Sequence, residues 1–231
     1  MNVKVEGSHG QTAAGTAEAI QDVINDHIEK RRSGINTNGA VWRGSVINLS
    51  LGGKVYSTAE HTQLQRAASL GIPVITSAGN DNEDASREYP CALGSEQALS
   101  VICVGGMDQY YRKAPFSNFG SNLALAAPAV GIAGPGHRSD QAETVSSGTS
   151  YAVPHVSALM ALFVSYESLN RGFNSYQVAK NRLVSNSYRG SMTGWPSNTE
   201  LIRLANSGIR HFNKPENWLP VSTLGTVDGI D

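Results

Sequence analysis

The sequence has little net charge and no long apolar run. Its 18 lysines and arginines nearly balance 19 aspartates and glutamates, which leaves a net charge of -1. Residues 123–136 are apolar but broken by Pro128 and several glycines, so they fall short of the ~18 residues that a membrane span needs. The first residues also lack the apolar core of a signal peptide. We therefore expect no nucleic acid and no membrane as partner.

Cysteine is scarce as well, because only Cys91 and Cys103 occur. The two bracket a loop that leads into an apolar segment at residues 99–104. A disulfide between them would close a loop of about a dozen residues and would stabilise the fold by roughly 2–3 kcal/mol on the chain-entropy model. The alternative is two free thiols, one of them buried in a strand. Cysteine usage alone leaves both possibilities open.

Strands and helices alternate along the chain. Short apolar runs predict strands at residues 3–5, 46–49, 72–76 and 101–104. Thr16 can cap a first helix that Gly34 ends, and residues 57–60 form a capping box for a second helix that Gly71 stops. The order predicts an α/β fold in which a parallel sheet is flanked by helices on both faces.

Two polar residues follow directly after predicted strands. Ser50 comes after the strand at residues 46–49, and Asn80 comes shortly after the strand at residues 72–76. Parallel sheets flanked by helices bind ligands beyond the carboxyl ends of their strands. Ser50 and Asn80 are therefore expected at the active edge of the sheet.

The segment from Gly148 to His155 places a small-residue turn just before Ser150, which opens an apolar helix over residues 150–167. Unpaired backbone N–H groups and the positive end of the helix dipole favour the negative charge that develops at such a position during acyl transfer. Pro154 is expected in or near the first turn, where a missing N–H costs little. A Gly-x-Ser turn alone equally fits a loop that the serine merely caps.

Three blocks together resemble the subtilisin-like serine proteases. The serine box of that family, Gly-Thr-Ser-x-Ala-x-Pro-His, is matched by residues 148–155. Residues 77–80, Ser-Ala-Gly-Asn, match the block that carries the oxyanion asparagine, and residues 46–53 match the strand along which the substrate lies. The blocks occur in the order of the family and at similar spacing over roughly residues 1–206.

The resemblance implies a serine endopeptidase that transfers an acyl group to Ser150. Asn80 would donate its side-chain amide to the oxyanion, whereas in isolation it could equally be a turn asparagine. The segment Ser50, Leu51 and Gly52 would pair with the substrate backbone, and Ala78 and Gly79 would wall the pocket for the substrate residue whose carbonyl is attacked, the P1 residue. No cofactor or metal site is identified, although calcium is possible by resemblance.

Two parts of the family's catalytic triad are missing from the sequence. The family has its aspartate in an Asp-Ser/Thr-Gly turn and its histidine in a His-Gly-Thr-His-Val-Ala-Gly segment, and neither occurs here in full. His9 is a near miss, because Ala14, Gly15 and Thr16 follow it. Residues 3–5, however, match the strand after the catalytic histidine, which would place His9 in a loop at the rim of the cleft. We expect His9 to be a surface or subsite histidine.

No other histidine is an evident general base. His155 lies five residues after Ser150 and, at about 100° per residue, points roughly 140° away around the helix. Solvated or structural roles are expected for the other four, His27, His61, His137 and His211. The chain therefore has a nucleophile and an oxyanion donor but no evident base.

We interpret residues 1–206 as a partial subtilisin-like peptidase domain with its N-terminal strands missing, and residues 207–231 as a loosely ordered tail. The chain alone is expected to be inactive, a monomer, and to take peptides or proteins as partners. An alternative is a non-catalytic homologue that binds peptides along the Ser50 strand. The resemblance also implies an extracellular setting, although the chain has no signal peptide, and this oxidising setting favours a disulfide between Cys91 and Cys103.

Overall fold

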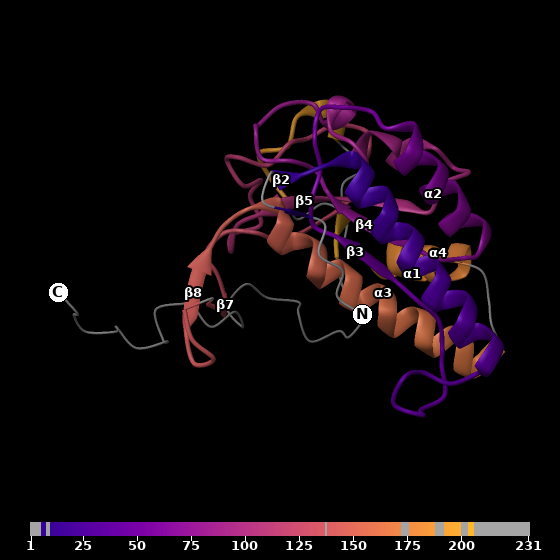
Figure 1. Ribbon diagram of the computed structural model, residues 1–231. Helices are drawn as coiled ribbons and strands as arrows, with labels where there is room; N and C mark the ends of the chain where they lie inside the picture. The colour runs from indigo at the N-terminus through magenta and orange to yellow at the C-terminus, as the bar shows by residue number, and fades with distance from the viewer. Residues whose placement is uncertain are drawn as a thin grey trace.

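A parallel sheet forms the centre of the molecule. Figure 1 shows the computed structural model, which describes residues 6–7, 10–136, 138–171, 176–187, 192–199 and 203–205. The sheet has five strands in the order β3-β4-β5-β6-β9, and every neighbouring pair is parallel. Their bounds are β3 Ile47–Leu49, β4 Val74–Ser77, β5 Val101–Met107, β6 Leu123–Pro128 and β9 Arg203–Leu204. The predicted α/β class is confirmed.

Helices α1 (Ala13–Ser33) and α2 (Thr58–Ser69) cover one face of the sheet. Their apolar side chains share a buried cluster with β3, β4 and β5; it includes Ile20, Ile24, Leu64, Ile47, Leu49, Val74 and Val101. The N-cap of α1 is Thr12, whose side chain accepts a hydrogen bond from the Gly15 N–H, and the predicted cap Thr16 is instead buried inside the helix. The predicted start was thus one turn late, because both threonines satisfy the capping pattern.

Helices α3 (Thr149–Arg171) and α4 (Tyr176–Asn186) cover the opposite face. They pack against side chains of β4, β5 and β6 in a second buried cluster that includes Ile75, Ile102, Val104, Leu125, Val153, Val156, Met160 and Leu183. Successive residues of a strand point to opposite faces, so Val74 and Ile75 belong to different clusters. The prediction of helices on both faces is confirmed.

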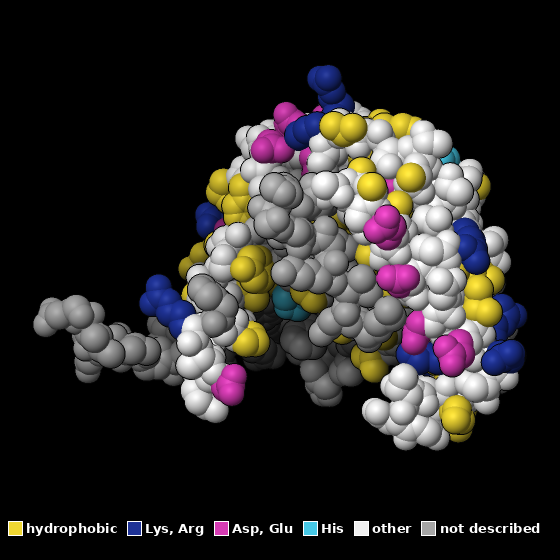
Figure 2. All heavy atoms as spheres, in the orientation of Figure 1, with side chains coloured by type: hydrophobic (Ala, Val, Ile, Leu, Met, Phe, Trp, Pro, Cys, Tyr) yellow, Lys and Arg dark blue, Asp and Glu magenta, His cyan; other side chains and the backbone are white. Residues whose placement is uncertain are grey.

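Several short elements surround this core. The strands β7 (Ile132–Pro135) and β8 (Glu143–Ser146) form an antiparallel arm that stands clear of the body (Figures 1 and 2). The strands β1 (Glu6–Gly7) and β2 (Gly10–Gln11) form a small hairpin. The 3-10 helices are η1 (Ala85–Arg87), η2 (Cys91–Ser95) and η3 (Ser197–Thr199). No helix within the described residues is both long and apolar enough to cross a membrane.

A disulfide bond joins Cys91 in η2 to Cys103 in β5. Both cysteines are fully buried, in a third apolar cluster with Ala78, Ala85, Leu123 and Ala126. The bond ties the loop after β4 to the middle of the sheet. The predicted pairing is confirmed.

Strand β3 lies at one edge of the described sheet, where it pairs with β4 alone among the described residues. A groove of about 850 Å³ runs beside it, lined by α1 on one side and by residues 41–49 on the other. The strand predicted at residues 3–5, His9 and the predicted tail at 207–231 all lie outside the described residues.

Candidate active site

Ser150 lies in the first turn of α3, as predicted. Gly148 precedes the helix with a φ of 154°, and its N–H donates to the carbonyl of Ala129, which anchors the turn to the end of β6. The Tyr151 N–H then donates to the Gly148 carbonyl and starts the helix. Pro154 is the sixth residue of α3, so it lies in the second turn and not in the first. It has no N–H to donate to the Ser150 carbonyl four residues earlier.

Asn80 follows β4 and is held against the start of α3. Its Oδ1 accepts hydrogen bonds from the Thr149 N–H at 2.8 Å and from the Thr149 hydroxyl at 3.0 Å. An amide whose oxygen accepts two donors has its NH2 group on the other side, where it can donate to a ligand. The exposed Asn80 amide is thus oriented by the residue next to Ser150. The sequence motif contained Thr149, but sequence reasoning gave it no role.

The loop after Asn80 is fixed by a second asparagine. The Asn118 N–H donates to the Gly79 carbonyl at 3.0 Å, and the buried Asn118 Oδ1 accepts from the N–H groups of Asp81 and Glu83, each at 3.0 Å. The Thr149 hydroxyl also lies 3.3 Å from the Gly79 carbonyl. These contacts join the loop after β4, the serine helix and the segment before β6 into one unit.

The segment Ser50–Gly52 continues from the carboxyl end of β3, as predicted. The Asn48 Nδ2 donates to the Ser50 hydroxyl at 2.9 Å, and the Ser157 hydroxyl of α3 donates to the Asn48 Oδ1 at 3.0 Å. The Leu51 carbonyl accepts from the hydroxyls of Thr76 and Ser77 at the end of β4. The predicted substrate strand is therefore tied both to the helix that carries Ser150 and to the strand that leads to Asn80.

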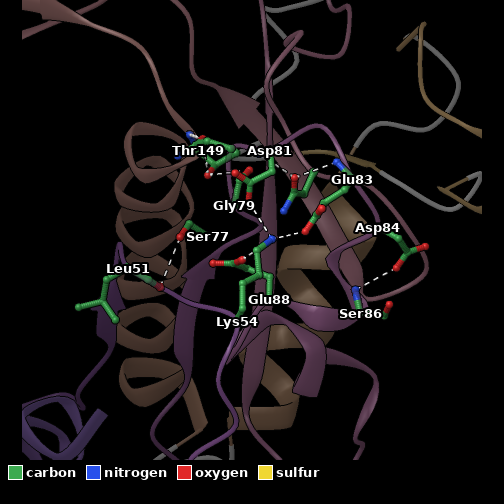
Figure 3. Close-up of polar contacts among 12 residues, drawn as sticks. Leu51, Lys54, Ser77, Gly79, Asp81, Glu83, Asp84, Ser86, Glu88 and Thr149 are labelled. Carbon is green, nitrogen blue, oxygen red and sulfur yellow. Dashed lines mark hydrogen bonds and ion pairs between the residues drawn. The ribbon is translucent and has the colours of Figure 1, made fainter. Parts of the chain in front are cut away.

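A charged cluster that sequence reasoning missed lies beside these segments. Lys54 contacts Asp81 at 2.8 Å, Glu83, and Glu88 at 3.2 Å (Figure 3). Asp81 and Glu83 accept hydrogen bonds from Lys54 and raise the pKa of its ammonium group, so Lys54 stays charged. Burial raises the pKa of Glu88, against the opposing effect of Lys54. No sequence motif predicts this cluster, because Lys54 is distant in the sequence from the three acidic residues and only the fold brings them together.

Each described histidine has a contact with a group other than Ser150. The Nδ1 of His155 lies 2.8 Å from the Tyr151 carbonyl of its own helix. His61 Nε2 lies 3.4 Å from Glu96. His27 is buried and packs edge-on against the Trp42 ring, with ring centroids 4.9 Å apart. His9, His137 and His211 lie outside the described residues, so the surface or subsite role expected for His9 stays a prediction.

Comparison with known proteins identifies a family. The model of the Subtilase family, peptidase S8, matches residues 1–200. The subtilisin-like serine protease pepC of Aspergillus niger is 32% identical over 218 residues, which are 92% of this chain and 40% of that protein. The extracellular serine proteinase of a Thermus strain is 34% identical over 171 residues, 70% of this chain and 40% of that protein.

A solved structure gives the same result for the fold. The crystal structure of a cold adapted subtilisin-like serine proteinase superposes with a TM-score of 0.67 at 28% identity, covering 87% of this chain and 63% of that one. The chain spans about two fifths of the length of the sequence relatives that it matches, given as 40% for each of the two above. A family match over residues 1–200, together with this fold and site, places the chain among known proteins: it belongs to the subtilase family of subtilisin-like serine proteases.

Proposed function

We propose that the chain supplies the nucleophile, an oxyanion donor and the substrate strand of a serine endopeptidase. The observation that carries the proposal is the double hydrogen bond from Thr149 to the Asn80 Oδ1, which orients the Asn80 amide beside the turn of Ser150. An amide prepared in this way can donate to the oxyanion that forms when a serine attacks a peptide carbonyl. The N–H of Ser150 would be the second donor.

Peptide substrate would lie along Ser50, Leu51 and Gly52 as an added strand, with its P1 side chain between this segment and Ala78 and Gly79. The family chemistry also needs a histidine base and an aspartate that orients it. We assign both roles to the family's Asp and His segments, neither of which occurs in full in this sequence. The chain alone is then a poor catalyst, because a serine without its base is a weak nucleophile.

A fluorophosphonate probe tests this proposal. A longer chain that carries the Asp-Ser/Thr-Gly and His-Gly-Thr-His segments upstream should be labelled at Ser150, and Ser150→Ala should abolish the label. The 231-residue chain should be labelled far more slowly. Brisk peptide cleavage by this shorter chain, lost on His9→Ala, would make His9 the base and refute the assignment of the base to a missing segment.

The second candidate is a non-catalytic homologue that binds peptides. It is favoured by the relay of hydrogen bonds from Ser157 to Asn48 and from Asn48 to Ser50. This relay holds the Ser50 strand in place without any need for a base. A longer chain that folds, binds peptides and resists the probe would support it. Its partner would in either case be a peptide or protein. The face shown in Figure 2 has acidic and basic side chains interspersed.

We further propose that the protein acts as an extracellular monomer. The buried disulfide between Cys91 and Cys103 supports an oxidising compartment, where such bonds form and persist. The acyl transfer proposed here uses protein groups, and calcium would have at most a structural role. Size-exclusion chromatography with light scattering checks the monomeric state. Titration with calcium during thermal unfolding checks whether calcium stabilises the fold.

A further inference from the structure

The two walls of the proposed P1 pocket each have a glycine that faces the Glu88 side chain. A Cβ added to Gly52 would lie 2.7 Å from the Glu88 Oε1, and one added to Gly79 would lie 3.0 Å from the Glu88 Cδ and closer still to the Asn118 Nδ2. Gly79 also has a φ of 95°, which side-chain-bearing residues rarely adopt. The Glu88 carboxyl group therefore lies in the space that these two glycines leave open.

The backbone beside Glu88 is attached to the substrate segment. The Gly53 N–H donates to the Tyr89 carbonyl at 2.9 Å, and the Tyr89 N–H donates to the Gly53 carbonyl at 2.7 Å. This pair of hydrogen bonds holds the residue after Glu88 against the residue after Gly52. The position of the carboxyl group relative to the pocket walls is thus set by the fold.

The charges around Glu88 are unbalanced. The ammonium group of Lys54 is shared by three carboxylates, and of its contacts with Asp81, Glu83 and Glu88 the one to Glu88 is the longest, at 3.2 Å. The side chains of Asp81 and Glu83 are 54% and 48% exposed, whereas that of Glu88 is only 8% exposed. Water stabilises the first two carboxylates, but a buried carboxylate depends on a nearby cation. Figure 3 shows Lys54 between the three acidic side chains.

We propose that Glu88 determines the P1 specificity of this site and selects substrates with lysine or arginine at P1. The inference rests on the proposed function, because it takes the Ser50–Gly52 and Ala78–Gly79 segments as the walls of the P1 pocket. A P1 ammonium or guanidinium group would approach Glu88 between Gly52 and Gly79. Lys54 would keep Asp81 and Glu83, so each cation in the cluster would still have a carboxylate partner.

A neutral P1 side chain of the same length cannot supply a cation to Glu88. It would shield Glu88 further from water, and the carboxylate would keep only its contact with Lys54, which Asp81 and Glu83 also contact. A guanidinium group can also accept the planar carboxylate in a two-point contact, which favours arginine over lysine. The existing Lys54 contact weakens the discrimination, so we expect a preference of about 10- to 100-fold and not the largest values known for charge recognition.

The experiment compares tetrapeptide amides with matched P1 residues, using the longer, probe-reactive chain. Arginine is compared with citrulline and lysine with norleucine, since each pair differs in charge and little in length. Glu88→Gln should lower kcat/KM for arginine and lysine by about 10- to 100-fold and leave citrulline and norleucine within about threefold. Glu83→Gln is the matched control, because it also removes a carboxylate from Lys54 but does not border Gly52 or Gly79. It should leave the arginine-to-citrulline ratio within about threefold.

A binding measurement separates this inference from the proposed function. Fluorescent peptides that end in arginine or citrulline are titrated onto the Ser150→Ala variant, and anisotropy gives the Kd. If the parent protein cleaves nothing but arginine peptides bind about 10-fold tighter in a Glu88-dependent way, the endopeptidase proposal fails and the specificity inference holds. If the protein cleaves peptides without preferring arginine to citrulline, or prefers alanine because Glu88 fills the pocket, the specificity inference is overturned and the endopeptidase stands.

Discussion

Asn80 shows how a side chain can be oriented before any substrate arrives. Both donors to its Oδ1 come from Thr149, so the residue before Ser150 sets the direction of the Asn80 amide. We expect Asn80→Leu in the active, longer chain to lower kcat by about 100- to 1,000-fold, a magnitude known for this donor in a subtilisin. KM should change little, because the amide acts mainly on the transition state.

Steady-state kinetics on one peptide substrate check this expectation. Thr149→Val is the companion variant, since it keeps the backbone N–H donor and removes only the hydroxyl; it should reduce kcat by less than Asn80→Leu does. Thr149→Ser keeps the hydroxyl and should therefore have the kcat of the parent protein. A large rise in KM with unchanged kcat for Asn80→Leu would mean that the amide binds substrate in its ground state instead.

His27 should make stability depend on pH. Burial, with a smaller contribution from Arg31 and against an opposing one from Asp26, lowers the pKa of His27 from 6.5 to about 4. Between these two values the unfolded chain binds a proton that the folded chain does not. Stability from this group is therefore fully present above pH 6.5 and is lost as the pH falls toward 4.

The variant His27→Phe tests this, because phenylalanine cannot titrate and can keep an edge-on contact with Trp42. The melting temperature of the parent protein should fall more steeply from pH 6.5 to 4 than that of the variant. Parallel curves over this range would show that His27 is not the source. Carboxylates titrate in both proteins, so their contribution to the pH dependence of the melting temperature cancels when the two curves are compared.

At the scale of elements, the disulfide joins the loop after β4 to β5. We expect replacement of Cys91 and Cys103 by serine to lower the free energy of unfolding by roughly 2–3 kcal/mol, the value for a loop of about a dozen residues. Both sites are fully buried, so the new hydroxyls add a further cost. Urea unfolding measures the change, and alkylation without reductant followed by mass spectrometry should leave both cysteines of the parent unlabelled. Two labelled thiols would contradict the bond.

The elements were largely predictable and their contacts were not. Apolar runs located β4 and β5, because a strand buried on both faces needs apolar side chains at nearly every position, and they located β3 through Ile47 and Leu49, which lie on its buried face. Ser57 was predicted as a cap and is one, whereas Thr12 and not Thr16 caps α1. In the site, motif spacing predicted Ser150 and Asn80, and the structure joins their surroundings through Thr149.

Glu88 could not have been found in this way. It lies eight residues beyond Asn80 in an irregular loop, and its place beside Gly52 depends on the pairing of Gly53 with Tyr89. Contacts of this kind arise from how loops close in three dimensions. Periodicity and local propensity carry no information about them.

For the whole molecule, the edge at β3 governs behaviour in solution. Among the described residues β3 pairs only with β4, and the groove of about 850 Å³ beside it is lined partly by Ile20, Val23, Ile47 and Leu49. Unpaired strand edges next to apolar side chains promote association between molecules. We expect the 231-residue chain by itself to be poorly soluble and to melt without a sharp transition.

Light scattering and differential scanning calorimetry measure these properties. A longer chain that supplies strands on the β3 side should be more soluble and should melt cooperatively. A sharp melt of the 231-residue chain, with well-dispersed amide signals in its NMR spectrum, would show that residues of this chain close the groove.

The relay from Ser50 through Asn48 to Ser157 has a mechanical consequence. It runs from Ser50, directly after β3, to Ser157 in the third turn of α3 in two hydrogen bonds of 2.9 and 3.0 Å. A fluctuation that tilts α3 therefore carries the end of β3 in the same direction. If substrate lies along this segment as proposed, the spacing between its scissile bond and the Ser150 hydroxyl would change little when the helix moves, because this polar link ties the two segments together outside the chemistry itself.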